Sequence, residues 1–183
     1  MPWQRVLVLG GIRSGKSEFA EALVTPYPPV HYIATARRLE GDAEWSARID
    51  AHRARRLPQW RTSEVGDTPH ALPDLLAGDE AGPGAADGAL IVDDLGGWVG
   101  TVMEAAAADR WPDLIAGLST AVSRCSPRLV LVSPEVGLSV VPTTPAGRTF
   151  ADTLGAVNQA VAAVCDIVVL VIAGNAVPVK GRL

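Results

Sequence analysis

The chain has 183 residues, 48% of them hydrophobic, which is enough for a substantial buried core, and we expect residues 1–183 to form a single domain. A formal net charge of −4 and an aromatic content of 5% argue against a nucleic-acid-binding protein, which needs clustered basic residues or stacking rings. Two cysteines are too few for a disulfide framework or a cysteine metal cluster, and no apolar run is long enough to span a membrane, so we expect a cytoplasmic protein without a membrane partner.

The first half of the chain alternates short apolar runs, typical of buried strands, with segments of helical spacing. In chain order, we predict a strand at 5–9, a helix at 16–24 that is ended by prolines, a strand at 30–34, a helix at 42–56, a weaker strand at 60–65, a short helix at 68–76 and a surface loop at 79–88.

The second half continues the alternation. It predicts a strand at 89–93, helices at 98–108 and 112–123, a strand at 128–133, a long helix at 147–164, a strand at 167–172 and a last short strand at 177–180. Strands that alternate with helices indicate an α/β fold, in which a mainly parallel sheet carries helices on both faces.

The turn between the first strand and the first helix matches the phosphate-binding pattern G-x-x-x-x-G-K-[ST] of P-loop enzymes. Glycines let successive amides point at phosphate oxygens, the lysine reaches the β- and γ-phosphates, and the last hydroxyl faces Mg²⁺. We therefore expect a nucleoside triphosphate to bind Gly10, Gly11, Ile12, Arg13, Ser14, Gly15, Lys16 and Ser17. The alternative is a glycine-rich turn with an incidental lysine.

An acidic residue stands at the tip of the strand predicted at 89–93. P-loop enzymes use such a carboxylate to organise the Mg²⁺ shell, and Asp93 is in that position, with Asp94 as a substitute. We expect Ser17 and Asp93 to hold the metal. The competing interpretation is that Asp93 only caps the next helix.

Arg48, His52 and Arg55 or Arg56 share one face of the helix predicted at 42–56. Spacing alone leaves two interpretations open. The first is a solvated basic face. The second makes His52 a nucleophile that the arginines keep neutral, while they hold a triphosphate for attack at its α-phosphorus.

Together, these motifs resemble the adenosylcobinamide kinase/adenosylcobinamide-phosphate guanylyltransferase family of cobalamin assembly. The resemblance runs over nearly the whole chain. Beyond the turn at 10–17, its matching residues are Ala20 to Ala22, Tyr32 to Thr35, Arg48, Ile49, His52, Trp60, Thr62, Glu64, Val92, Asp93, Trp98, Glu135 to Gly137, Val141, Pro142, Arg148, Phe150, Asp152, Gly155, Asn158 and Gln159.

The resemblance implies a bifunctional enzyme with a RecA-like P-loop fold. ATP or GTP would phosphorylate the aminopropanol hydroxyl of adenosylcobinamide. GTP would then transfer GMP to a histidine, which falls on His52 here, and from there to the phosphorylated corrinoid, giving adenosylcobinamide-GDP. A homotrimer is implied as well. Two alternatives remain: a transferase-only homologue, and a regulatory or assembly protein that binds GTP without corrinoid chemistry.

We expect five nucleotide-binding residues beyond the turn, with His52 and Lys16 as catalytic residues. The five are Thr35, Arg48, Glu64, Asp93 and Glu135. Thr35 ends a predicted strand, where open α/β sheets bind ligands. Glu135 would bind a ribose hydroxyl or the metal shell, or else is a strand-end carboxylate that faces water.

The chain departs from the family pattern at two single positions and in one four-residue segment. The family usually has Asn at the position of Pro134, an acidic residue at the position of Thr143, and Cys-Leu-Thr-Leu where this chain has Asp94-Leu-Gly-Gly97. Pro134 carries neither a side-chain amide nor a backbone N–H, so any contact that Asn makes there is lost.

Overall fold

The computed structural model describes residues 3–35, 43–65, 68–78, 88–105 and 110–183, and the side chains of residues 43–46, 48 and 51 lie outside that description. The described chain alternates strands with helices. In order, the elements are β1 (Arg5–Gly10), α1 (Lys16–Val24), β2 (Val30–Ala34), α2 (Ala43–Arg55), β3 (Arg61–Glu64), α3 (Ala71–Ala77), β4 (Ala89–Asp93), α4 (Leu95–Glu104), α5 (Trp111–Arg124), β5 (Arg128–Pro134), α6 (Pro145–Val164), β6 (Ile167–Ile172) and β7 (Asn175–Lys180).

One seven-stranded sheet forms the centre of the molecule, in the order β3-β2-β4-β5-β1-β6-β7. All neighbours are parallel except β6 and β7, which form an antiparallel pair. The register pairs Gly10 with Pro134 and Ala34 with Asp93, so the carboxyl ends of β1, β5, β2 and β4 meet at one edge of the sheet. That edge is where open α/β sheets bind ligands.

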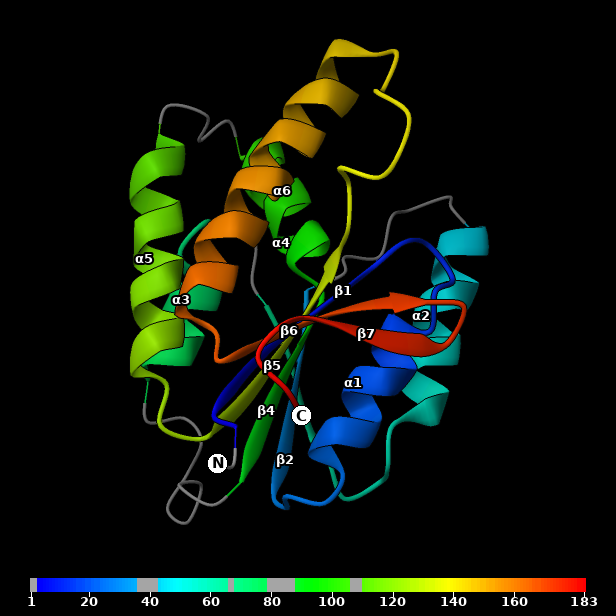
Figure 1. Cartoon of the computed structure of the whole chain (residues 1–183), viewed down its shortest axis with the longest axis vertical. Helices are drawn as coiled ribbons and strands as arrows, with labels where there is room; N and C mark the ends of the chain where they lie inside the picture. Colours follow the sequence, from blue (N-terminus) through cyan, green and yellow to red (C-terminus); the bar gives the residue numbers. More distant parts are fainter. Residues whose placement is uncertain (1–2, 36–42, 66–67, 79–87, 106–109) are drawn as a thin grey trace.

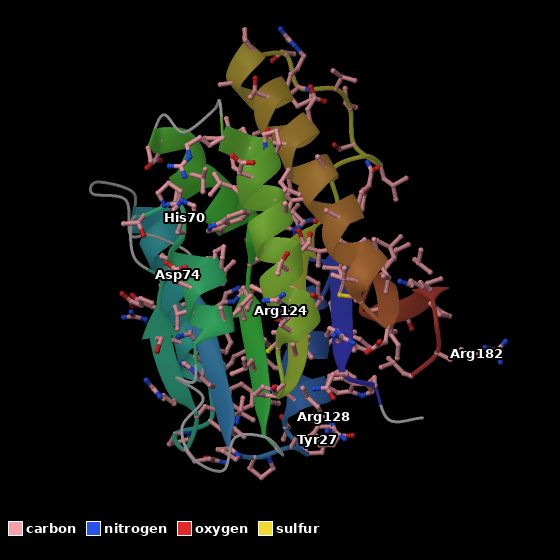
Figure 2. The ribbon with its side chains drawn as sticks, turned by 90° about the vertical axis from the view of Figure 1, so that its left-hand side faces the viewer. Tyr27, His70, Asp74, Arg124, Arg128 and Arg182 are labelled. Carbon is pink, nitrogen blue, oxygen red and sulfur yellow. The ribbon has the colours of Figure 1, made fainter. Side chains whose placement is uncertain are left out.

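Helices cover both faces of the sheet. Helices α1 and α2 lie on one face, and α3, α4, α5 and α6 lie on the other (Figure 1). On the second face α3 packs against α5 and α5 against α6. Figure 2 looks onto this layer, with His70 and Asp74 labelled at α3 and Arg124 at the end of α5. No helix among the described residues is both long and apolar enough to span a bilayer.

Strand alternation decides which side chains face which layer of helices. Leu7, Ile33 and Val92 belong to the core cluster under α3 to α6, whereas Val8, Tyr32 and their neighbours pack on the side of α1. Burial of each large aliphatic side chain stabilises the fold by about 1.5–3 kcal/mol. Because side chains alternate with a period of two, Tyr32 and Asp93 point to the face that carries α1 and α2.

The predicted fold class is confirmed, and the differences lie at element ends. Helix α4 begins at Leu95 rather than 98, because the Asp94 side chain caps it and Gly96 and Gly97 do not prevent the first turn. Helix α6 begins at Pro145, where Thr144 caps it. Strand β7 is longer than predicted and pairs with β6 at the edge of the sheet. The predicted residues 42, 79–87 and 106–108 lie outside the described part of the chain.

Candidate active site

The phosphate-binding turn lies between β1 and α1. Gly15 at its end has a φ of 91° and Arg13 a φ of 56°, so the backbone passes through the left-handed region twice. The Ser14 carbonyl accepts a hydrogen bond from Gly174 N at 2.8 Å, which ties the turn to the β6–β7 hairpin. A Cβ on Gly10 would lie 2.4 Å from Ser14 Oγ and 2.9 Å from the Val171 carbonyl. The first glycine is therefore required by close packing.

Lys16 lies at the start of α1, where the first amides of the helix are unpaired and favour anions. Its Nζ donates to the Gly11 carbonyl at 3.3 Å and so reaches back across the turn. The ammonium group and the helix N-terminus thus lie on the same side of the turn. This is the arrangement that a polyphosphate requires.

Asp93 lies at the end of β4 and connects three elements. Its side chain accepts hydrogen bonds from Ser17 Oγ at 3.3 Å and from Tyr32 Oη at 2.5 Å, and its Oδ2 lies 3.3 Å from His52 Nδ1. Burial opposes ionisation of this carboxyl, but the hydrogen bonds from His52 and Tyr32 and the charge of Lys16 outweigh it, so its pKa lies below the ordinary value. Asp93 is therefore a buried carboxylate.

The competing interpretation of Asp93 as a helix cap is wrong, because its neighbour performs that function. Asp94 Oδ1 accepts a hydrogen bond from Gly97 N at 2.9 Å and caps α4. Burial and the charge of Asp93 raise the pKa of Asp94 to about 6. The two adjacent carboxyls thus have different surroundings, and Asp93 alone faces Ser17 and His52.

His52 lies in the last turn of α2, among arginines that are already paired. Arg55 contacts Glu18 at 3.2 Å and Glu21 at 3.5 Å, and these two contacts dock α2 onto α1. Within α2 it also lies 3.3 Å from His52 Nδ1. Arg53 pairs with Glu64. The basic run of the sequence is therefore more than a solvated face, because it holds His52 at the end of β4.

Arg56 lies against an aromatic pair. Its guanidinium carbon is 3.8 Å from the centroid of the Tyr32 ring, and Tyr32 stacks on Trp60 with 6.4 Å between centroids. The cation lies over the ring face, where the π-electrons attract it. This stack fixes the Tyr32 ring, whose hydroxyl reaches Asp93.

These side chains surround one cavity of about 400 Å³. It is bordered by the turn, α1, the ends of β2, β3 and β4, the last turns of α2 and the first turn of α4. The lining residues are Arg13, Ser14, Gly15, Lys16, Ser17, Glu18, Tyr32, Ala34, Ile49, His52, Arg53, Arg55, Arg56, Glu64, Asp93, Asp94 and Gly97. A volume of this order accommodates a ligand of nucleotide size.

The predicted site residues fall into two groups. Lys16, Ser17, His52, Glu64 and Asp93 line the cavity together with Arg13, Ser14 and Gly15. The others do not: Gly10, Gly11 and Ile12 belong to the turn, Thr35 is buried and bonded through its hydroxyl to the backbone of Asp94, and Glu135 accepts from the amides of Gly137 and Leu138. The side chain of Arg48 lies outside the described residues.

Sequence reasoning did not assign a role in the site to Tyr32, Arg53 or Glu21. Tyr32 was part of the family pattern, but a tyrosine inside an apolar strand gives no sign of polar function. Its hydroxyl becomes important only because β2 and β4 are neighbours in the sheet.

Oxygen donors beside the turn fit a magnesium ion. Ser17 Oγ and Asp93 Oδ1 lie 3.3 Å apart at the start of α1, and Mg²⁺ uses few protein oxygens of this kind together with water and phosphate. Glu21, His52 and Asp93 also bring one ligand atom each within 4.8 Å of the others. Because the Arg55 guanidinium already pairs with Glu21, we assign no metal to that second group.

Two of the departures from the family pattern contact each other. A Cβ on Gly96 would lie 2.9 Å from Cγ of Pro134, so the proline ring fills the space that a side chain at position 96 would need.

Arg148 is a residue of the family pattern that has a structural role. Its Nη1 donates to the carbonyls of Pro142 and Thr143. It orders the segment after β5 and does not line the cavity.

Comparison with solved structures supports the fold. The chain matches an ATPase from the type III secretion system of pathogenic bacteria with a TM-score of 0.57 and 12% identity, over 91% of this chain and 50% of that chain. At this identity the match shows a shared architecture and nothing further.

Comparison with sequences is more specific. The chain is 39% identical to the bifunctional adenosylcobalamin biosynthesis protein CobU of Salmonella typhimurium, over 96% of this chain and 99% of that protein. It is 39% identical to CobP of Pseudomonas aeruginosa over 97% and 98%, and 38% identical to CobU of Escherichia coli over 96% and 99%. The family model for cobinamide kinase / cobinamide phosphate guanyltransferase matches residues 6–179. The chain therefore belongs to the cobinamide kinase / cobinamide phosphate guanyltransferase family.

Proposed function

We propose that this protein is a bifunctional enzyme of cobalamin biosynthesis. It phosphorylates adenosylcobinamide with ATP or GTP, and it transfers GMP from GTP to the resulting phosphate, giving adenosylcobinamide-GDP. Family membership over nearly the whole chain supports both activities. The single observation that carries the proposal is that Lys16 and His52, from separate elements, line the same cavity.

In the kinase step the turn binds the polyphosphate. Its amides and the N-terminus of α1 take the phosphate oxygens, and Lys16 stabilises the charge that develops between the β- and γ-phosphates. Mg²⁺, when bound by Ser17 and Asp93, neutralises further charge on the phosphates. The corrinoid hydroxyl attacks the γ-phosphorus and releases its proton to water, the bond to the β–γ bridging oxygen breaks, and the nucleoside diphosphate leaves.

In the transferase step His52 acts as the nucleophile. An unprotonated imidazole nitrogen attacks the α-phosphorus of GTP, an N–P bond forms, and the bond to the α–β bridging oxygen breaks to release pyrophosphate. A phosphate oxygen of the corrinoid then attacks the same phosphorus and frees the histidine. The GMP–imidazole bond is of the phosphoramidate type, which acid cleaves and base does not.

The test is labelling with GTP that carries ³²P at the α-position, in the presence of magnesium. We expect acid-labile, base-stable label on the wild-type protein and no label on His52→Ala, which should still bind nucleotide. His70→Ala is the matched control, because His70 lies outside the cavity and contacts Arg110. A folded, nucleotide-binding wild type that takes no label would contradict the transferase mechanism.

The kinase activity is measured separately, as transfer of the γ-phosphate to adenosylcobinamide. An active transferase without this activity would identify a transferase-only homologue. We further propose a cytoplasmic homotrimer, on the family resemblance, with nucleotides and the corrinoid as its small-molecule ligands. Sedimentation equilibrium at several protein concentrations tests the trimer.

A further inference from the structure

The two oxygens of Asp93 face different halves of the cavity. Oδ1 accepts from Ser17 Oγ on the side of the phosphate-binding turn, whereas Oδ2 contacts Tyr32 Oη and His52 Nδ1 on the side of α2. A carboxylate that is 8% exposed and held at both oxygens has little freedom to turn. Asp93 is therefore placed to act on the histidine as well as on the metal.

Tyr32 fixes which oxygen faces the histidine. Its phenol hydroxyl donates a hydrogen bond to Oδ2 at 2.5 Å. The ring itself contacts both Arg56 and Trp60. Tyr32 thus anchors the oxygen that His52 approaches.

The contact at His52 Nδ1 decides which imidazole nitrogen carries the proton. A neutral imidazole has one N–H donor and one lone pair, and the partner of one nitrogen selects the tautomer. An ionised Asp93 can only accept, so it selects the form with the proton on Nδ1 and the lone pair on Nε2. The Arg55 guanidinium, 3.3 Å from the same nitrogen, can only donate and would select the opposite form.

Building on the proposed function, we propose that Tyr32 and Asp93 are positioning residues that hold His52 in the Nδ1–H tautomer, so that Nε2 attacks the α-phosphorus of GTP. Asp93 prevails over Arg55 because the guanidinium is already shared between Glu18 and Glu21. As the Nε2–P bond forms and pyrophosphate leaves, positive charge develops on the imidazole. The adjacent Asp93 carboxylate stabilises it while the proton stays on Nδ1.

Nitrogen-15 NMR of the histidine rings measures the tautomer directly, in magnesium-free protein at mildly alkaline pH. The chain has three histidines, and His52→Ala identifies the signal of interest. We expect wild-type His52 to carry its proton on Nδ1. In Asp93→Ala the acceptor is gone, Arg55 is the remaining partner of Nδ1, and the population should shift to the Nε2–H form. The signals of His31, bonded to Ser63, and of His70 are internal references that should stay unchanged.

The rate of His52 labelling supplies a second readout. Tyr32→Phe keeps the aromatic ring but removes the hydroxyl, and we expect labelling at saturating GTP to slow by about 10- to 100-fold, the equivalent of one hydrogen bond to a charged group. Any of three results would overturn the inference. The first is a wild-type His52 in the Nε2–H form, and the second is the same tautomer in Asp93→Ala as in wild type. The third is a normal labelling rate in Tyr32→Phe. If instead the wild type takes no label at all, the proposed function fails, and the NMR result is a separate observation.

Discussion

Asp94 is a partly buried acid beside a second carboxylate, and this placement makes the stability of the fold depend on pH. Its pKa is raised from 3.8 to about 6, so the native state binds the proton more tightly than the unfolded chain does. The stabilisation that comes from this tighter proton binding is therefore fully present below about pH 4, and it is lost as the pH rises through about 6 and Asp94 ionises. At neutral pH the ionised carboxylate destabilises the native state by about 1–2 kcal/mol, after a discount for its partial exposure.

Asp94→Asn should remove this effect and keep the helix cap, since asparagine is an equally good N-cap residue and can accept from Gly97 N. We expect the variant to exceed the wild type in free energy of unfolding by about 1–2 kcal/mol at pH 7.5 and by much less at pH 4.5. Urea denaturation of both proteins at the two pH values measures the difference. A gain that is equal at both would show that ionisation of Asp94 is not its cause.

At the scale of elements, helix α4 approaches the end of β5 more closely than a side chain allows. A Cβ on Gly96 would lie 2.9 Å from Cγ and 3.2 Å from Cδ of Pro134, whereas a Cβ on Gly100 of the same helix meets nothing within 4 Å. Gly96→Ala should therefore destabilise the protein by about 1–2 kcal/mol despite the better helix propensity of alanine. Gly100→Ala should stabilise it by about 0.5–1 kcal/mol.

Urea denaturation of the two alanine variants gives the comparison, because both replacements lie in one helix and change the same atoms. Replacing Pro134 with alanine removes the ring that Gly96 faces. The cost of Gly96→Ala should then shrink in a double-mutant cycle, as expected for residues in contact. Equal effects at positions 96 and 100 would rule out the close approach.

The same elements indicate how far sequence reasoning reaches. The strands at 89–93 and 167–172 were predicted to the residue, because a strand buried on both faces is a continuous apolar run. The start of α4 was predicted too late, because Gly96 and Gly97 weaken helix propensity while the cap at Asp94 acts locally and outweighs them.

The candidate site also has a part that the sequence predicts and a part that it does not. The phosphate-binding turn was predictable because its sequence pattern lies within eight consecutive residues, 10–17. The contacts among Tyr32, Asp93 and His52 were not, since these residues come from β2, β4 and α2 and meet only through the strand order. Resemblance to a family identified His52, but its hydrogen-bond partners required the three-dimensional arrangement.

At the scale of the whole molecule, the cavity joins parts of the chain that are distant in sequence. Its lining comes from β2, β3, β4, α1, α2 and α4 and from the turn, whose Ser14 is also bonded to the β6–β7 hairpin. A ligand that binds only when these parts are assembled stabilises the native state over the unfolded chain. Bound nucleotide should therefore protect the entire fold and not the turn alone.

The two lysines of the chain make this expectation testable. With GTP and magnesium at about 100 times the dissociation constant, the native state gains about 2.7 kcal/mol, which corresponds to a rise in Tm of about 5–10 °C for a protein of this size. Lys16→Ala should lose most of this rise, because the ammonium group no longer meets the phosphates. Lys180→Ala, which removes hydrogen bonds to the Ala162 and Ala163 carbonyls far along the chain, should lower the starting Tm but keep the rise. Thermal unfolding with and without nucleotide compares the three proteins, and an undiminished rise in Lys16→Ala would show that GTP binds away from the turn.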